Sequence, residues 1–352
     1  MSPVSAGTDI FLKRQGKIKI SGQSSRSNLR FFAVKNGKMK RKFLGIDIGG
    51  TNIRGKVISE EGGTLGERKT LSDAHMGISR LMENLADFIE GFAGEGLSAI
   101  GIGVPGTVDR ASGTLVQAPN IANTRDFPFT EVLSEKIGTA TPVFIQNDAS
   151  CAALGEYRAG AGRGSGSMVM ITLGTGFGGG IILDGKLWPG EDGFAGEVGH
   201  ITINPSGPIC GCGARGCIET YVSQVAIKRI VREHPELRER LAGTEESALP
   251  ERLAELAREK DQAAISVWND FGANLGVGIS ILVNTLDVKT VVVGGGLSGA
   301  WELFIGKALE EAERRCLGGT QRGLQVKRAA LGDDAGVLGA CYVAETGLGE
   351  RS

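Results

Sequence analysis

The chain contains one local design twice, and this repeat constrains its fold more than any other feature. Residues 43–58, FLGIDIGGTNIRGKVI, have the pattern of a strand, a glycine turn and a second strand. Residues 168–183, MVMITLGTGFGGGIIL, have the same pattern. Runs rich in β-branched residues and broken by Gly and Thr are typical of strands joined by tight turns. The repeat predicts two similarly built halves.

Helices and strands are expected to alternate around these two copies. Apolar residues recur at helical spacing over residues 78–92. Residues 288–296, VKTVVVGGG, are expected to form a strand that ends in three glycines, between helices near 260–284 and 300–316. This alternation predicts an α/β protein with helices packed on central sheets.

The composition is that of a globular protein with an excess of glycine. Glycine accounts for 56 of 352 residues, about twice its usual share, so tight turns and close backbone approach are expected. No apolar run reaches the ~18 residues of a membrane span. Six cysteines without a secretory signal favour a reducing compartment. The predicted location is the cytoplasm.

Positive charge is concentrated at the N-terminus. Residues 1–42 hold eleven Lys and Arg but one acid, whereas the whole chain has a net charge of −1. The segment has no helical or strand period, and we expect a disordered basic extension over residues 1–42. Three explanations are open: an extension upstream of a true start at Met39, an organelle transit peptide, and a nucleic-acid-binding arm.

The glycine turns indicate that the protein binds phosphate. Five glycines fall between residues 174 and 180, and their entropy cost makes a simple hairpin a poor explanation. Exposed N–H groups in such turns suit phosphate oxygens. The G-x-G-x-x-G match here continues into a strand rather than a helix, and no P-loop motif occurs. With the glycines at 294–296, the turns predict a nucleotide held between two domains.

A carboxylate accompanies the first glycine turn. Asp47 stands at the end of the expected strand, two residues before Gly49. A carboxylate beside a phosphate turn suits a Mg²⁺ ion held between them through water. The alternative is an Asp that only caps the turn.

Half of the cysteines crowd into the stretch CGCGARGC, residues 210–217, and His200 precedes them by ten residues. His200, Cys210, Cys212 and Cys217 fit a tetrahedral Zn²⁺ site of the Cys₃His type. Because the protein fills all four positions, the zinc is expected to be structural and to hold a glycine-rich loop in place. A coincidental cluster and a redox pair are the alternatives.

Further polar side chains flank this metal site. Glu197 lies three residues before the histidine, and Glu219 lies two residues after the last cysteine. With Asn147 they would form a polar wall suited to a ligand with many hydroxyl groups. The zinc is therefore expected to matter more for this ligand than for the nucleotide.

Six stretches make a family resemblance specific: GIDIGGTNIR, GIGVPGTVD, QNDASCAALGE, LGTGFGGG, GEVGH and CGCGARGCIET. In these stretches the sequence resembles the ROK family of sugar kinases and repressors. The resemblance implies a hexokinase/actin-like α/β fold, with two RNase H-like domains around a central cleft. A small N-terminal domain is expected over 43–147, completed by a C-terminal helix near 334–350. A large domain with the zinc loop is expected over 148–333.

The resemblance also implies roles for individual residues. Asp148 takes the position of the general base, where the alternative is a helix N-cap. The sugar-binding positions correspond to Asn120, Asn147, Asp148, Glu197, His200 and Glu219. The nucleotide-binding positions correspond to Asp47, Gly49, Gly50, Thr51, Asn52, Thr175, Gly176, Gly294, Gly295 and Gly296. The zinc ligands correspond to His200, Cys210, Cys212 and Cys217.

The implied activity is phosphorylation of a hexose by ATP with Mg²⁺. CIET after the zinc loop favours glucose, and N-acetylglucosamine, N-acetylmannosamine and fructose are the alternative substrates. The family's repressors carry a helix-turn-helix domain before the first strand, and only 42 residues precede that strand here. A sugar-responsive regulator or nucleic-acid binder is therefore the less favoured alternative. A homodimer is expected, with no membrane partner.

Overall fold

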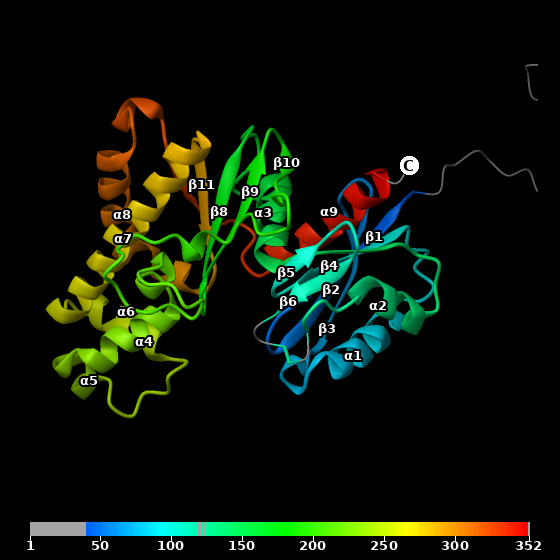
Figure 1. Ribbon diagram of the computed structural model, residues 1–352, viewed down its shortest axis with the longest axis horizontal. Coiled ribbons are helices and arrows are strands. Elements are labelled where there is room, and N and C mark those ends of the chain that lie inside the picture. The colour runs from blue at the N-terminus through cyan, green and yellow to red at the C-terminus, as the bar shows by residue number, and fades with distance from the viewer. Residues whose placement is uncertain (1–39, 119–120, 123, 351–352) are drawn as a thin grey trace, which may run out of the picture. The chain divides into compact units, whose positions relative to one another are not determined.

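The computed structural model describes residues 40–118, 121–122 and 124–350 (Figure 1). The expected basic extension lies outside the described residues except for residues 40–42. Lys42 already begins the first strand. Within the described ranges, no helix is long and apolar enough to cross a bilayer.

The two copies of the sequence repeat each form the centre of a five-stranded sheet. The first sheet has the order β3-β2-β1-β4-β7 and the second the order β10-β9-β8-β11-β12. In both, the second strand of the repeat pairs antiparallel with the first, and the next two strands are parallel. The prediction of two similarly built halves is confirmed, because the sheets share one strand order and one set of directions.

The strand bounds place the glycine turns at equivalent positions. The first sheet consists of β1 Lys42–Ile48, β2 Asn52–Ser59, β3 Thr64–Leu71, β4 Ala99–Val104 and β7 Val143–Asn147. The second consists of β8 Met168–Leu173, β9 Phe177–Leu183, β10 Lys186–Leu187, β11 Thr290–Gly294 and β12 Gln325–Arg328. A small hairpin adds β5 Thr107–Asp109 and β6 Thr114–Gln117.

Helices cover the faces of both sheets (Figure 1). The α-helices are α1 Ile78–Glu90, α2 Phe129–Ile137, α3 Asp148–Ala159, α4 Gln224–Glu233, α5 Pro235–Arg240, α6 Leu249–Arg258, α7 Gln262–Leu286, α8 Trp301–Arg315 and α9 Asp334–Glu350. One core cluster joins α1 and α2 to the first sheet, and a larger one joins α4 to α8 to the second. The expected α/β layering is therefore present, as the apolar spacing of α1 predicted.

The opposite sheet faces are covered by α9 and α3, and glycines allow these helices to approach closely. A Cβ added at Gly45 of β1 would lie 2.3 Å from the carbonyl oxygen of Val337 in α9. A Cβ at Gly155 of α3 would lie 2.2 Å from the carbonyl oxygen of Ala335. Glycine thus serves close helix packing in this chain as well as turns. The division into domains at residues 147 and 148 stays a prediction.

Candidate functional site

Asp148 lies where β7 ends and α3 begins. The cap of α3 is Asn147, whose Oδ1 accepts a hydrogen bond from the Ser150 N–H at 2.9 Å. Asp148 is the first helical residue, so its alternative interpretation as the N-cap is wrong. Its Oδ1 accepts from the Ala149 N–H at 2.8 Å and from Asn147 Nδ2 at 3.1 Å. These contacts fix the rotamer of the Asp148 carboxylate.

The Asp148 carboxylate is electrostatically coupled to Asp47, which lies in β1 one residue before its end. Burial and, to a smaller extent, repulsion from Asp148 together raise the pKa of Asp47 to about 7, against the attraction of Arg54. Burial likewise raises the pKa of Asp148 to about 6, with an added repulsion from Glu197. The site thus concentrates negative charge, and a bound cation would relieve it.

The first glycine turn joins β1 to β2 and is stabilised by hydrogen bonds within the protein. The Gly49 N–H donates to the carbonyl of Asn52 at 2.8 Å, and Ser72 Oγ donates to the carbonyl of Gly50 at 3.0 Å. No described atom lies within 4 Å of the position that a Cβ would take at Gly50. The outer side of this turn, with exposed Thr51, is therefore open to a ligand.

The second glycine turn joins β8 to β9 and carries Thr175 and Gly176. The first amides of α4 hold it: the Gln224 N–H donates to the carbonyl of Gly174 at 3.0 Å, and the Val225 N–H donates to that of Thr175 at 3.3 Å. Thr175 is exposed, and no described atom lies within 4 Å of a Cβ position at Gly174. This turn too presents an open outer side.

Three of the five glycines between 174 and 180 do not belong to that turn. Gly178, Gly179 and Gly180 lie within β9 and are paired with β8. A Cβ at Gly180 would lie 2.4 Å from the Cβ of Ala153 in α3, and one at Gly179 would lie 2.5 Å from Val198. These three allow close packing of the strand against neighbouring segments. Packing of β9 therefore accounts for the cost of three of the five glycines, and only Gly174 and Gly176 belong to the turn.

The third glycine turn, Gly294 to Gly296, begins at the last residue of β11. Gly295 has φ +83°, and a Cβ there would lie 2.4 Å from the carbonyl oxygen of Leu173 at the end of β8. Only glycine fits this position, for both its backbone conformation and its space. The third turn thus lies directly against the strand that leads into the second turn.

His200, Cys210, Cys212 and Cys217 gather into one cluster, with all ligand atoms within 4.8 Å of one another. Cys210 Sγ lies 3.5 Å from His200 Nδ1, and Cys212 Sγ lies 3.7 Å from Cys217 Sγ. Tetrahedral Zn²⁺ with its usual bond lengths requires about 3.6 Å between S and N ligands and about 3.8 Å between two S ligands. The donor set and its spacing therefore fit zinc, with Nδ1 as the histidine ligand.

The remaining sugar-binding candidates lie around this cluster. Glu197 is exposed, and its Oε2 lies 3.8 Å from His200 Nε2, the ring nitrogen directed away from Cys210. Glu219 Oε2 accepts from the Phe177 N–H at 3.0 Å, and Oε1 lies 3.7 Å from Cys210 Sγ. Asn120 lies outside the described residues. The structure thus places Glu197 close enough to act electrostatically on Asp148 and in contact range of His200.

Arg54 and Asp333 belong to this site and escaped the sequence reasoning. Arg54 donates to the Asp333 carbonyl at 2.8 Å, and its guanidinium lies 3.4 Å from the Asp333 carboxylate. Both residues act electrostatically on Asp47. Arg54 lies opposite Asp47 in the β1–β2 register, which a hairpin alignment could have revealed. Nothing local could have indicated Asp333, because it is 279 residues away.

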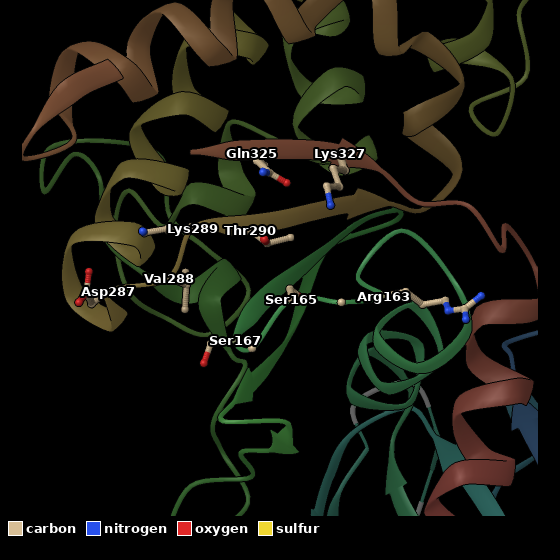
Figure 2. A pocket seen from close by; sticks show the side chains of 11 residues that line it. Arg163, Ser165, Ser167, Asp287, Val288, Lys289, Thr290, Gln325 and Lys327 are labelled. Atoms are coloured by element: carbon tan, nitrogen blue, oxygen red, sulfur yellow. The ribbon is translucent and has the colours of Figure 1, made fainter. Parts of the chain in front are cut away.

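One hollow among the described residues lies away from the candidate site residues. Figure 2 shows it at the other ends of β8, β11 and β12, lined by residues that include Thr290, Gln325 and Lys327. Its volume is about 390 Å³, and none of the candidate site residues lines it. The candidate site is therefore identified from its glycine turns and carboxylates and not from this hollow.

Comparison with known proteins identifies relatives across nearly the whole described chain. The sequence pattern of the ROK family matches residues 43–346. A glucokinase of Thermotoga maritima is 34% identical over 88% of this chain and 99% of its own length. The crystal structure of a ROK family glucokinase from Streptomyces griseus, in complex with glucose and AMPPNP, is 36% identical with a TM-score of 0.73, over 87% of this chain and 99% of that one. A xylose repressor of Caldicellulosiruptor bescii is 31% identical over 96% of this chain and 86% of its own length.

Proposed function

The chain belongs to the ROK family, and from this premise we propose that it is a glucokinase, which transfers the terminal phosphoryl group of ATP to glucose. The observation that carries the proposal is the pairing of Asp148 and Asp47. Asp148 lies at the start of a helix, Asp47 lies beside an open glycine turn, and the charge of Asp148 raises the pKa of Asp47. The match with glucokinases over their whole length supports this assignment.

Asp148 acts as the general base. Phosphoryl transfer needs mainly positioning and charge neutralisation, because the transition state is loose and the protein forms little covalent contact with it. The attacking sugar hydroxyl must lose its proton, and a carboxylate with a pKa of about 6 is ionised at neutral pH yet basic enough to accept it. Asn147 and the Ala149 N–H hold that carboxylate in one orientation.

The glycine turns hold the phosphates of ATP. Gly50 and Gly174 have open space on their outer sides, so a phosphate can approach their backbone closely. Asp47 would hold Mg²⁺ at the first turn, where the ion supplies charge neutralisation for the phosphates. The crowding of Asp47, Asp148 and Asp333 around one cation, Arg54, fits such an ion.

The zinc cluster shapes the sugar side of the site. Zinc at His200 Nδ1 leaves Nε2 and the neighbouring Glu197 carboxylate for sugar hydroxyls. Asn147 and Asn120 complete the set that the family resemblance implies. We further propose the division into a small domain, 43–147 with α9, and a large domain, 148–333, around a central cleft.

The test is a panel of hexoses assayed for ADP release. Glucose is expected to give the highest kcat/KM, ahead of fructose, N-acetylglucosamine and N-acetylmannosamine. Equal or higher kcat/KM with an amino sugar would replace glucose as the substrate while keeping the kinase. Absence of ADP release with every hexose, under conditions where the chain is folded, would contradict the proposal.

A sugar-responsive regulator is the second candidate, and one observation favours it. The xylose repressor matches 96% of this chain, more than the 88% matched by the Thermotoga maritima glucokinase, and residues 1–42 are strongly basic. A DNA mobility-shift assay over a range of salt concentrations, on the full chain and on one that begins at Met39, separates the two. If the chain is a kinase and not a regulator, we expect only weak DNA binding that decreases as the salt concentration rises. None of the six cysteines forms a disulfide, which is consistent with the proposed cytoplasmic location.

A further inference from the structure

The side chain of Glu219 joins two parts of the site that were assigned separate tasks. Its Oε2 accepts from the Phe177 N–H at 3.0 Å, directly after the second glycine turn. Its Oε1 lies 3.7 Å from Cys210 Sγ in the metal cluster. The carboxylate therefore spans the distance between a metal ligand and the phosphate-binding turn.

The Glu219 carboxylate occupies the space that a side chain at position 176 would need. A Cβ at Gly176 would lie 2.3 Å from Glu219 Oε2, so the Glu219 carboxylate would have to leave its present position. At Gly174, in the same turn, no described atom lies within 4 Å of the corresponding position. The observed position of the Glu219 carboxylate thus depends on glycine at position 176, whereas the Cβ position at Gly174 is open.

The segment that follows Cys217 also contacts the second glycine turn through its backbone. Ser223 Oγ donates to the carbonyl of Glu219 at 2.7 Å, and Ser223 caps α4 by accepting from the Ala226 N–H at 3.0 Å. The next two amides, of Gln224 and Val225, donate to carbonyls of the turn. A movement of the loop at Cys217 would therefore reach the turn through a side chain and through the start of a helix.

We propose that Glu219 is a positioning residue that ties the Cys₃His site to the phosphate turn at Thr175 and Gly176. This inference rests on the proposed function, in which that turn holds ATP. Metal bound at the cluster would then affect the affinity for nucleotide as well as the affinity for sugar. This changes the expectation from the sequence, in which zinc affects mainly sugar binding. Glu219 acts on the phosphates through the backbone of the turn.

The test compares Glu219→Ala and Glu219→Gln in the full chain. Titration calorimetry with Mg²⁺-AMPPNP and no sugar is expected to show at least about ten-fold weaker binding for Glu219→Ala, because a charge-assisted hydrogen bond is lost. Glu219→Gln keeps an acceptor oxygen and should stay within about three-fold of the wild type. Amide exchange at Phe177 should accelerate in the Ala variant, remain slow in the Gln variant, and accelerate in the wild type once a chelator removes the metal. The strand amide of Ile181, inside β9, is the internal control.

A double-mutant cycle provides a readout that does not need ligand binding. Gly176→Ala should lower the melting temperature of the wild type but cost less in the Glu219→Ala background, since the clash with Oε2 is then gone. Gly174→Ala, the matched control, should cost the same in both backgrounds. Additive effects of Gly176→Ala, unchanged Phe177 exchange in Glu219→Ala, or a loss confined to glucose affinity would each overturn the link. A wild type that binds neither AMPPNP nor glucose would instead contradict the proposed function, while the cycle and the exchange data still decide the link.

Discussion

Replacing Asp148 with Asn separates its chemistry from its structural role. Asn keeps an Oδ1 that can accept from the Ala149 N–H and from Asn147, so both hydrogen bonds of the carboxylate can persist. It removes the carboxylate that we propose as the proton acceptor for the sugar hydroxyl. General-base assistance contributes about 10²–10⁴-fold, so kcat should fall by at least about two orders of magnitude while AMPPNP still binds.

The same substitution should stabilise the fold at alkaline pH. Burial raises the pKa of Asp148 from 3.8 to about 6, so the native state binds its proton more tightly than the unfolded chain does. The stability that this proton provides is complete below pH 3.8 and is lost as the pH rises through about 6. At pH 8 the ionised carboxylate therefore costs up to about 3 kcal/mol, from roughly two pKa units. Solvent that reaches this half-buried group reduces that figure.

Melting temperatures and steady-state kinetics of the Asp148→Asn variant check both effects. We expect the variant to melt a few degrees above the wild type at pH 8 and to show a smaller gain at pH 4.5. Asp184→Asn is the matched control: Asp184 is exposed in the turn between β9 and β10 with φ 48°, a conformation that Asn tolerates well. It should change neither quantity. If Asp148→Asn keeps more than about a tenth of the wild-type kcat, or melts lower at pH 8, the assignment of Asp148 as a desolvated base is refuted.

Three further predictions concern other parts of the site. The kcat/KM of the wild type should fall as the pH drops through 7 to 6, because protonation of Asp47 and Asp148 removes the charges that the reaction uses; a flat profile from pH 8 to 5 would contradict this. Metal analysis of the pure chain should find one zinc per chain, lost in Cys212→Ser together with a sharp rise in the sugar KM; a metal-free wild type with normal kinetics would refute it. Gly295→Ala should prevent stable folding, because the added Cβ meets the Leu173 backbone, whereas Gly299→Ala, with no described atom within 4 Å of its Cβ position, should be tolerated; equal expression and melting temperatures would show the reasoning to be wrong.

The basic N-terminal segment is expected to be dispensable for catalysis. The family match begins at residue 43 and β1 begins at Lys42. A chain that starts at Met39 should keep its melting temperature and its kcat. A large loss of either would mean that the removed residues contribute to the body.

Local sequence determined the features whose parts lie close together along the chain. The two strand–turn–strand units were predicted because their alternation and turn residues lie within sixteen positions each. The metal cluster was predicted because four ligands fall within eighteen residues, and the structure gathers all four. In both cases the interacting groups are close in sequence, so bringing them together costs little chain entropy. The local pattern is therefore enough to predict the structure.

Local sequence misled where one residue type serves two purposes. Asn and Asp are both good helix caps. Only the observed start of α3 shows that Asn147 is the cap and that the Asp148 carboxylate is not used for capping. Glycine is suited both to open turns and to close packing. Gly174 and Gly180 cannot be told apart by their neighbours in sequence, yet one faces open space and the other faces α3.

Tertiary structure alone decided which distant groups share an environment. Asp47 was a candidate from its turn, but Arg54, Asp333 and the start of α9 tune its charge, and α9 lies almost three hundred residues further along the chain. Glu219 was expected only at the sugar, but folding also sets it under Gly176. The pKa of a carboxylate depends on its burial and on the charges near it in space. Both depend on how sheets and helices pack, which no local sequence pattern encodes.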